Sequence, residues 1–378
     1  MLTRLGFNNI EKWLFKNKIL ILYGARQVGK TTMSKQLVEK YQGLYLNCEK
    51  TEIKKILETR SPEIIKGYIG KYRFVVLDEA QVILGIGEIL KLLIDTFPDL
   101  QILATGSSSF DLANRTQEPL TGRKITFSLY PISLTELDLV YNRFEIQNQL
   151  EKILIYGMYP EILLTESNDE KRIKLQELSG DYLYKDVLQF ENLKKSDLLR
   201  KLLQALALQL GSEVSYRELS ALLNTSVETI IRYIELLEKS FVIFRLSSFS
   251  RNLRNELSKK NKIYFYDLGI RNSIINNFND LNLRTDRGAL WENFCVLERK
   301  KYWSNQMHDI PSYFWRTHQQ KEIDYLEDFN GKLLAFEFKW NAKKQIVLNK
   351  EFAQAYPNSN FQLINSNNYW KLIGDYSS

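Results

Sequence analysis

A glycine-rich motif near the N-terminus constrains the fold of this chain more than any other feature. Residues 24–32 read GARQVGKTT, which is the pattern G-x4-G-K-[ST] in full. The apolar segment KILILY precedes the motif, and the helix-compatible segment MSKQLVEKY follows it. Such a strand–loop–helix unit surrounds a phosphate with backbone N–H groups and adds the positive end of the helix. The motif therefore predicts an α/β domain with a parallel sheet that binds a nucleotide through its phosphates.

Every residue of this loop is a candidate for nucleotide binding, and two side chains have specific expected roles. We expect Lys30 to contact the β and γ phosphates and the hydroxyl of Thr31 to coordinate Mg²⁺. The other candidates are Gly24, Ala25, Arg26, Gln27, Val28, Gly29 and Thr32. The predicted cofactors are ATP and Mg²⁺.

Two consecutive carboxylates end a second strand-like segment, RFVVLDEAQ. At this position Asp78 would hold Mg²⁺ through its water molecules, and Glu79 would orient or deprotonate the attacking water. An acid beside the metal ligand favours hydrolysis of the nucleotide over binding alone. The alternative interpretation of such a pair by itself is a solvated strand end.

Polar and basic residues further along the chain are candidates for completing this site. Thr105 and Ser107 follow a third strand-like segment and are candidates for sensing the γ-phosphate or for capping a turn. Arg115 and Arg123 are candidate arginine fingers, acting within the chain or on a second copy of it. A surface position without a catalytic role is the alternative for both arginines.

Hydrophobic periodicity predicts four parts. Short strands rich in Ile, Val and Leu alternate with amphipathic helices in the first part, as in a sheet buried on both faces. The expected strands are Lys18–Tyr23, Leu44–Asn47, Phe74–Leu77 and Gln101–Thr105. The expected parts are the nucleotide-binding domain at 1–145, a helical connector at 146–195, a winged-helix-like part at 196–260 and a mixed α/β part at 261–378.

The winged-helix prediction rests on three helix-sized segments before a strand at Phe241–Phe249. The helices are expected at Leu198–Leu210, Tyr216–Leu223 and Val227–Lys239, which is helix-turn-helix spacing. Residues 194–262 contain thirteen Lys and Arg but only seven Asp and Glu, so DNA or RNA, if it is a partner, would be held here; solvated helix faces are an equal alternative. A basic cluster follows the strand: Arg251, Arg254, Lys259, Lys260 and Lys262. The alternative is a protein-contact module or an ATPase lid.

A hairpin near the C-terminus gathers acidic residues with a lysine. Asn330-Gly331 favours a two-residue type I′ turn, which would pair Asp324 with Glu337. Any loop of even length places Asp324, Glu337 and Lys339 on one face, whereas a three-residue loop would not. Two carboxylates and a lysine can hold a divalent metal and activate water for phosphodiester hydrolysis. An exposed face of alternating charge is the alternative.

One further acid could join this group. Glu292 lies on a probable helix whose apolar face uses Leu290, Phe294 and Leu297. It is a candidate metal ligand, and a glutamate on the helix surface is an equal alternative.

Composition excludes several classes of protein. The chain has 378 residues, of which 44% are hydrophobic and 26% charged, so it is neither fibrous nor disordered. Its two cysteines and two histidines have no metal-ligand spacing, which argues against a zinc site and a disulfide framework. No apolar run approaches the roughly 18 to 20 residues of a membrane span, and no secretory signal pattern is present. We expect a cytoplasmic protein with no membrane partner.

The order of these motifs resembles a widespread family of bacterial and archaeal AAA+-type ATPases. The resemblance rests on GARQVGKTT, VVLDEAQ, ATGSSS, LTGRKITFSLYPIS, YGMYPEIL, YLYKDV, KIYFYDLGIRN, GALWENF and the EID and EFK pair. In that family the C-terminal domain of unknown function is related to the PD-(D/E)XK restriction-endonuclease-like fold. The resemblance also implies a homo-oligomer, because such ATPases often form rings.

Several roles follow from this resemblance. Gly29, Lys30 and Thr31 match the Walker A positions, and Asp78 and Glu79 match the Walker B positions. The remaining matches are Arg123 to the family's Gly-Arg, Asp324 to the D position, Glu337 and Lys339 to the E-x-K positions, and Glu292 to the acid of the preceding helix.

The expected function is Mg²⁺-dependent hydrolysis of ATP by a protein that acts on or with nucleic acid. One alternative is an ATP-regulated, metal-dependent nuclease. Another is a slow nucleotide-gated switch that binds a protein or DNA partner.

Overall fold

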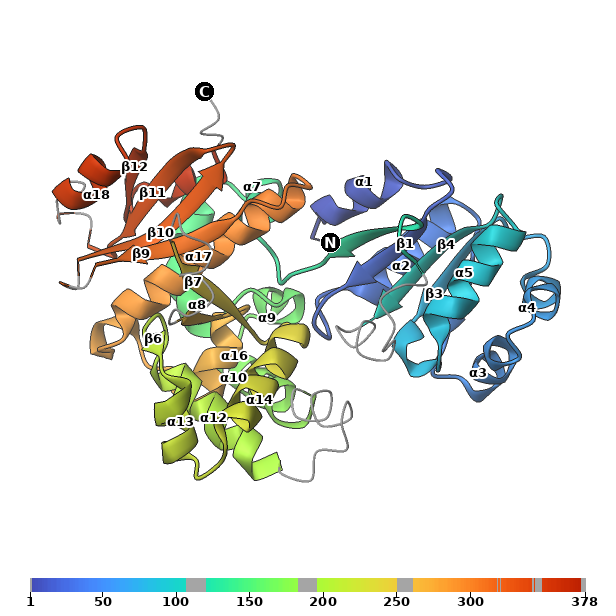
Figure 1. Ribbon diagram of the computed structural model, residues 1–378, viewed down its shortest axis with the longest axis horizontal. Helices are drawn as coiled ribbons and strands as arrows, with labels where there is room; N and C mark the ends of the chain where they lie inside the picture. Colours follow the sequence, from blue (N-terminus) through green and yellow to red (C-terminus); the bar gives the residue numbers. More distant parts are fainter. Residues whose placement is uncertain are drawn as a thin grey trace. The chain divides into compact units, whose positions relative to one another are not determined.

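The computed structural model describes residues 2–106, 120–182, 196–249, 261–317, 319, 321–341, 343 and 349–374. The chain forms two compact units (Figure 1), the first mainly from Met1–Ile132 and the second mainly from Ser133–Lys185, Lys194–Glu238 and Val242–Ser378. Several residues considered above lie outside the described ranges: Ser107, Arg115, Arg251, Arg254, Lys259, Lys260 and His318.

The first unit contains a five-stranded sheet in the order β2-β3-β4-β1-β5. Its strands are β1 (Ile19–Tyr23), β2 (Leu44–Asn47), β3 (Phe74–Asp78), β4 (Gln101–Gly106) and β5 (Lys124–Ser128). Every neighbouring pair is parallel, so the prediction of a parallel sheet is confirmed. The parallel arrangement brings the carboxyl ends of all five strands to one edge.

Helices bury the faces of this sheet. They are α1 (Leu5–Glu11), α2 (Lys30–Lys40), α3 (Thr51–Glu58), α4 (Pro62–Ile69) and α5 (Ile86–Thr96). Alternate residues of β1, Ile19 and Ile21, join an aliphatic core with side chains from α3, α4 and α5. The period of two explains how a strand with no exposed residue presents one set of side chains to each face.

The second unit contains a seven-stranded mixed sheet in the order β12-β11-β10-β9-β7-β8-β6. Its strands are β6 (Glu213–Val214), β7 (Ile243–Ser248), β8 (Asn261–Phe265), β9 (Ser312–Arg316), β10 (Glu322–Phe329), β11 (Lys332–Phe338) and β12 (Asn360–Ile364). β7 pairs in parallel with β9 through Ser247 and Tyr313. The sheet is therefore continuous past residue 260, where the sequence predicted a boundary, because periodicity along the chain carries no record of pairing between distant strands.

The second unit also contains helices in the described part of the chain. They are α7 (Leu134–Asp138), α8 (Arg143–Tyr156), α9 (Pro160–Leu164), α10 (Asn168–Glu177), α12 (Ser196–Leu208), α13 (Tyr216–Leu222), α14 (Val227–Lys239), α16 (Leu268–Ile274), α17 (Arg287–Asn305) and α18 (Lys350–Ala355). The three helices predicted before β7 are present within two residues of their expected ends. Their order with the strands is α12, β6, α13, α14, β7 and β8.

Two of the motifs that carry the family resemblance hold α8 against α16. The carboxylate of Asp267 accepts hydrogen bonds from the backbone N–H of Met158 (2.7 Å) and of Ile270 (3.0 Å). A Cβ on Gly157 would lie 2.1 Å from Asp267, so only glycine fits at this position. The segment expected as a separate helical connector is thus part of the core of the second unit.

Candidate functional site

The phosphate-binding loop follows β1 at the carboxyl edge of the first sheet. Gly29 has φ +103° and precedes the first residue of α2, a conformation that disfavours side chains with a Cβ. A Cβ on Gly24 would lie 2.3 Å from the carbonyl oxygen of Leu129. Both glycines are therefore required by the backbone itself, as the motif predicted.

The side chain of Lys30 is folded into this loop. Lys30 is 5% exposed, and its Nζ donates hydrogen bonds to the carbonyl oxygens of Gly24 and Ala25, both at 2.9 Å. The ammonium group is thus held inside the loop by neutral carbonyls. A phosphate would offer it a stronger, charged acceptor at the same position.

Asp78 ends β3 and accepts hydrogen bonds from three hydroxyl groups. Thr31 donates to it at 3.0 Å, and Thr105 and Tyr45 donate short hydrogen bonds. β4 lies between β1 and β3, which places Thr105 at the end of β4 between the loop and the acid. Thr31 and Asp78 supply the oxygen ligands that Mg²⁺ prefers, so this pair of residues fits the ion.

Sequence analysis missed Tyr45. Its pKa is raised, first by burial and then by the negative charge of Asp78. Tyr45 belongs to β2, which is the neighbour of β3 in the sheet. The sequence does show a polar residue near the end of the second strand. Placing that residue beside Asp78, however, requires knowledge of the strand order.

Glu79 follows Asp78 with a left-handed backbone, φ +53°. Its backbone N–H donates to the hydroxyl of Thr105 at 3.3 Å, and its carboxylate accepts from the side-chain amide of Gln81 at 2.5 Å. Thr105 therefore contacts both carboxylate residues. This position agrees with its expected place beside the γ-phosphate, although sensing itself stays a prediction.

Arg123 lies at the amino-terminal end of the strands, opposite the carboxyl end that carries the loop. It precedes β5, its carbonyl accepts from the N–H of Ile19, and its guanidinium pairs with Asp95 at 2.8 Å. A strand of five residues at about 3.3 Å each, roughly 16 Å, separates it from the loop edge. In this structure Arg123 cannot contact the nucleotide site of its own chain, so only the role in a second copy stays a prediction.

The hairpin of the second unit has the predicted register. Asn330 and Gly331 have φ of +53° and +83°, and Phe329 pairs with Lys332. These values confirm a two-residue turn with positive φ at both positions. The ammonium of Lys339 lies 3.0 Å from Asp324 and 2.8 Å from Glu337, so the expected grouping on one face is confirmed.

Two more carboxylates join this group. Oxygen atoms of Glu292, Glu322 and Asp324 all lie within 4.8 Å of one another, which is a spacing that a metal ion could bridge. The hydroxyl of Tyr264 donates to Glu292 at 2.7 Å. Sequence analysis missed Glu322, although it precedes Asp324 by two residues and so had to share its face of the strand.

Lys262 places a cation inside this acidic cluster. Its Nζ lies 2.8 Å from Glu292 and also forms an ion pair with Glu322, and its side chain is 3% exposed. The prediction that Lys262 contacts nucleic acid from a surface cluster is therefore wrong. The side chain is buried because Lys262 belongs to β8 of the sheet, and there two carboxylates compensate its charge.

Burial dominates the electrostatics of the cluster. It raises the pKa of Glu292 to about 7, against the opposing effect of Lys262. The pKa of Glu337 is also raised to about 7, by burial and then by the charge of Asp324. Burial alone would lower the pKa of Lys262, but Glu292, Glu322 and Asp324 together raise it.

Comparisons with known proteins agree with the division of the chain into two units. Residues 16–138 match a family model described as an AAA domain. Residues 147–281 match a domain of unknown function (DUF8612), and residues 287–373 match another (DUF4143). The first unit thus contains a domain of the AAA type.

Two relatives match over most of the chain. An uncharacterized protein of Mycobacterium tuberculosis is 26% identical over 333 residues, covering 87% of this chain and 72% of its own. An uncharacterized protein of Methanocaldococcus jannaschii is 26% identical over 343 residues, covering 84% and 74%. The Walker-type ATPase PABY2304 of Pyrococcus abyssi has a similar fold, with TM-score 0.50 and 17% identity over 73% of this chain and 96% of its own. Among the described residues, no helix combines the length and apolarity that crossing a membrane requires.

Proposed function

We propose that this protein hydrolyses ATP with Mg²⁺ at the carboxyl edge of the first sheet. The observation that carries the proposal is the hydrogen bond between Thr31 and Asp78, with Glu79 as the next residue. This contact joins the loop that would hold the phosphates to the acids that would hold the metal and the water. Bound Mg²⁺ would neutralise charge on the phosphates.

Each residue then has a defined task. The backbone of the loop and Lys30 bind the phosphates, and the carboxylate of Glu79 accepts the proton of the attacking water. Thr105 fixes the relative position of the two acids through its contacts with both. The proposed water attacks in line with the bond to the leaving phosphate.

Glu79→Gln tests this proposal, because glutamine keeps the size of the side chain and removes the base. We expect ATP turnover to fall by about 10²- to 10⁴-fold while nucleotide binding persists. Glu88→Gln is the matched control, since Glu88 is exposed and pairs with Arg60. Unchanged phosphate release in Glu79→Gln would disprove the role of Glu79.

A second activity is suggested by the carboxylates of the second unit. We propose metal-dependent phosphodiester hydrolysis at Asp324, Glu337 and Lys339, with Glu292 as a further ligand. The contacts of Lys339 with both acids support it. The test incubates single- and double-stranded DNA and RNA with Mn²⁺ and one of three proteins. These are the wild type, Asp324→Asn and the control Asp280→Asn, which changes an exposed site. Cutting by the wild type that only Asp324→Asn abolishes supports the activity, and equal cutting by all three contradicts it.

The segment from α12 to β8 is the proposed contact with nucleic acid. Its order of helices and strands is the order expected of a winged helix, which supports the proposal. Binding should weaken steeply with salt, because Lys and Arg would displace counterions from phosphates. Salt-independent binding of a protein partner would instead favour the alternative of a slow nucleotide-gated switch. A mass measurement with ATP would test for a homo-oligomer in which Arg123 of one copy completes the nucleotide site of another.

A further inference from the structure

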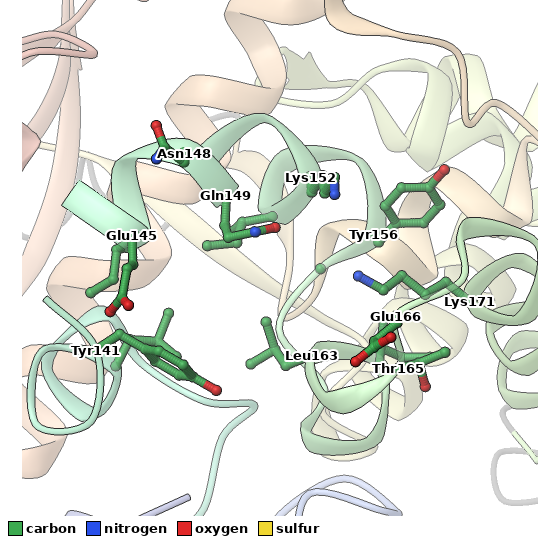
Figure 2. A pocket seen from close by; sticks show the side chains of 15 residues that line it. Tyr141, Glu145, Asn148, Gln149, Lys152, Tyr156, Leu163, Thr165, Glu166 and Lys171 are labelled. Atoms are coloured by element: carbon green, nitrogen blue, oxygen red, sulfur yellow. The ribbon is translucent and has the colours of Figure 1, made fainter. Parts of the chain in front are cut away.

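A pocket of about 460 Å³ lies in the second unit (Figure 2), and none of its lining residues belongs to the sheet that carries the acidic cluster. Its lining comes from α7, α8, α9, the start of α10 and the segments that join them. The side chains important here are Ile146, Lys152, Tyr156, Leu163 and Lys171. The volume is within the range of sites for small organic molecules.

Lys171 places a buried cation at this pocket. It is 7% exposed, and its ammonium lies 5.6 Å from the ring centre of Tyr156. In the described part of the chain it has no hydrogen-bond or ion-pair partner. Figure 2 shows its amine directed toward the middle of the pocket, with Lys152 on the adjacent wall.

The surroundings of Lys171 add positive rather than negative charge. Burial lowers the pKa of Lys171, and the charge of Lys152 lowers it further. Lys171 is also in the first turn and a half of α10, near the positive end of that helix. An anion at this position would relieve all three effects.

The acids that line the pocket do not supply that anion. The carboxylate of Glu145 accepts from the N–H of Asn142 at 2.9 Å in a capping box, and Glu166 is exposed and forms no ion pair with Lys171 within the described residues. Lys174, three residues further along α10, differs: its Nζ lies 3.0 Å from Glu161 and 3.1 Å from the hydroxyl of Thr165. The fold thus compensates one lysine of this helix and leaves the other open to the pocket.

The remaining wall is apolar. Ile146, Ile153, Ile162 and Tyr156 are buried and line the pocket. We propose that this pocket binds a small organic anion, with its anionic group on Lys171 and an apolar body against these side chains. The site is separate from the nucleotide loop and from the acidic cluster.

Calorimetric titration of the full chain with octanoate, octanol and inorganic phosphate tests the proposal. Octanoate and octanol share an apolar chain, whereas only octanoate carries the charge. We expect octanoate to bind about ten- to a hundredfold more tightly than octanol, the range of one charge-assisted hydrogen bond. Phosphate, which lacks the apolar body, should bind more weakly than octanoate.

Two variants assign the effect to Lys171. Lys171→Met should abolish the preference for octanoate, and Lys174→Met should keep it. Thermal denaturation controls for the fold: Lys171→Met should melt at or above the wild-type temperature, because it removes an uncompensated buried charge. Equal binding of octanoate and octanol to the wild type, a preference that persists in Lys171→Met, or phosphate binding as tight as octanoate binding would each overturn the proposal.

Discussion

Carboxylates cluster after a strand in one unit and along a hairpin in the other, but different groups contact the carboxylates in the two sites. In the first unit, Asp78 accepts hydrogen bonds from the hydroxyls of Thr31, Thr105 and Tyr45. In the second, ammonium groups of Lys262 and Lys339 are paired with the acids. Hydroxyls leave the charge in place, whereas lysines cancel it.

This difference indicates how each site would respond to a divalent cation. Hydroxyl donors can turn and become ligands, so a metal ion at Asp78 needs no buried cation to leave. In the second unit a metal ion must compete with Lys262 for Glu292 and Glu322. The first site therefore fits the proposed metal–nucleotide complex, whereas in the second two lysines offset part of the charge of four carboxylates.

Removing the loop lysine should have the largest effect. In Lys30→Met we expect ATP turnover to fall by about 10²- to 10³-fold, because a positioned donor to the phosphates is lost. Lys71→Met, at an exposed position before β3, is the control and should keep wild-type turnover. Phosphate release measured alongside nucleotide binding checks this, and an active Lys30→Met would contradict the assignment of the site.

Removing the buried lysine of the second unit should strengthen metal binding by its cluster. Lys262→Met leaves Glu292 without its cation and Glu322 with Arg316 alone, so we expect a loss of about 3 kcal/mol of unfolding free energy in EDTA. Mn²⁺ should restore much of this loss in the variant and stabilise the wild type less, because the ion competes there with Lys262.

Urea denaturation followed by tryptophan fluorescence measures this, since five of the six tryptophans, all but Trp13, lie in the second unit. The control is Lys332→Met, at an exposed position in β11. Equal stabilisation of wild type and Lys262→Met by Mn²⁺ would remove the distinction between the two sites.

Buried acids should also make the stability of the second unit depend on pH. Burial raises the pKa of Asp267 to about 6, so the folded state holds this proton more tightly than the unfolded state. The resulting stabilisation is complete below about pH 4 and is lost as pH rises through 6, which amounts to roughly 3 kcal/mol of unfolding free energy.

Denaturation at several pH values checks the expected decline. Asp267→Asn should make the decline between pH 4 and 7 less steep, while the raised pKa values of Glu292 and Glu337 keep part of it; the variant also weakens the contacts with Met158 and Ile270. A profile as steep in the variant as in the wild type would show that other groups cause the decline.

The smallest effect is expected at Tyr45. Tyr45→Phe removes one of the three hydroxyls on Asp78, so we expect the apparent affinity for Mg²⁺ during turnover to rise by about threefold. Tyr68→Phe, an exposed tyrosine that bonds to Glu52, is the control. A fall in Mg²⁺ affinity would instead show that Tyr45 helps to hold the metal.

Local signals predicted the parts of both sites that lie on one stretch of chain. The loop from Gly24 to Thr32 and the register of the hairpin at Asn330-Gly331 depend on backbone conformations that nearby residues impose. Contacts between strands were not predicted in the same way. Tyr45 reaches Asp78 only because β2 lies beside β3, and Lys262 reaches Glu292 only because β8 packs on α17.

The sequence alone determined the nucleotide loop, the parallel sheet of the first unit and the face shared by Asp324, Glu337 and Lys339. These follow from glycine conformations and from the period of two in strands, which act over a few residues. Tertiary structure alone decided that Arg123 lies at the far end of the strands, that Lys262 is buried among acids and that Lys171 faces a pocket in which no described acid forms an ion pair with it. Burial and strand order set these outcomes, and both arise from packing between segments that are distant in the chain.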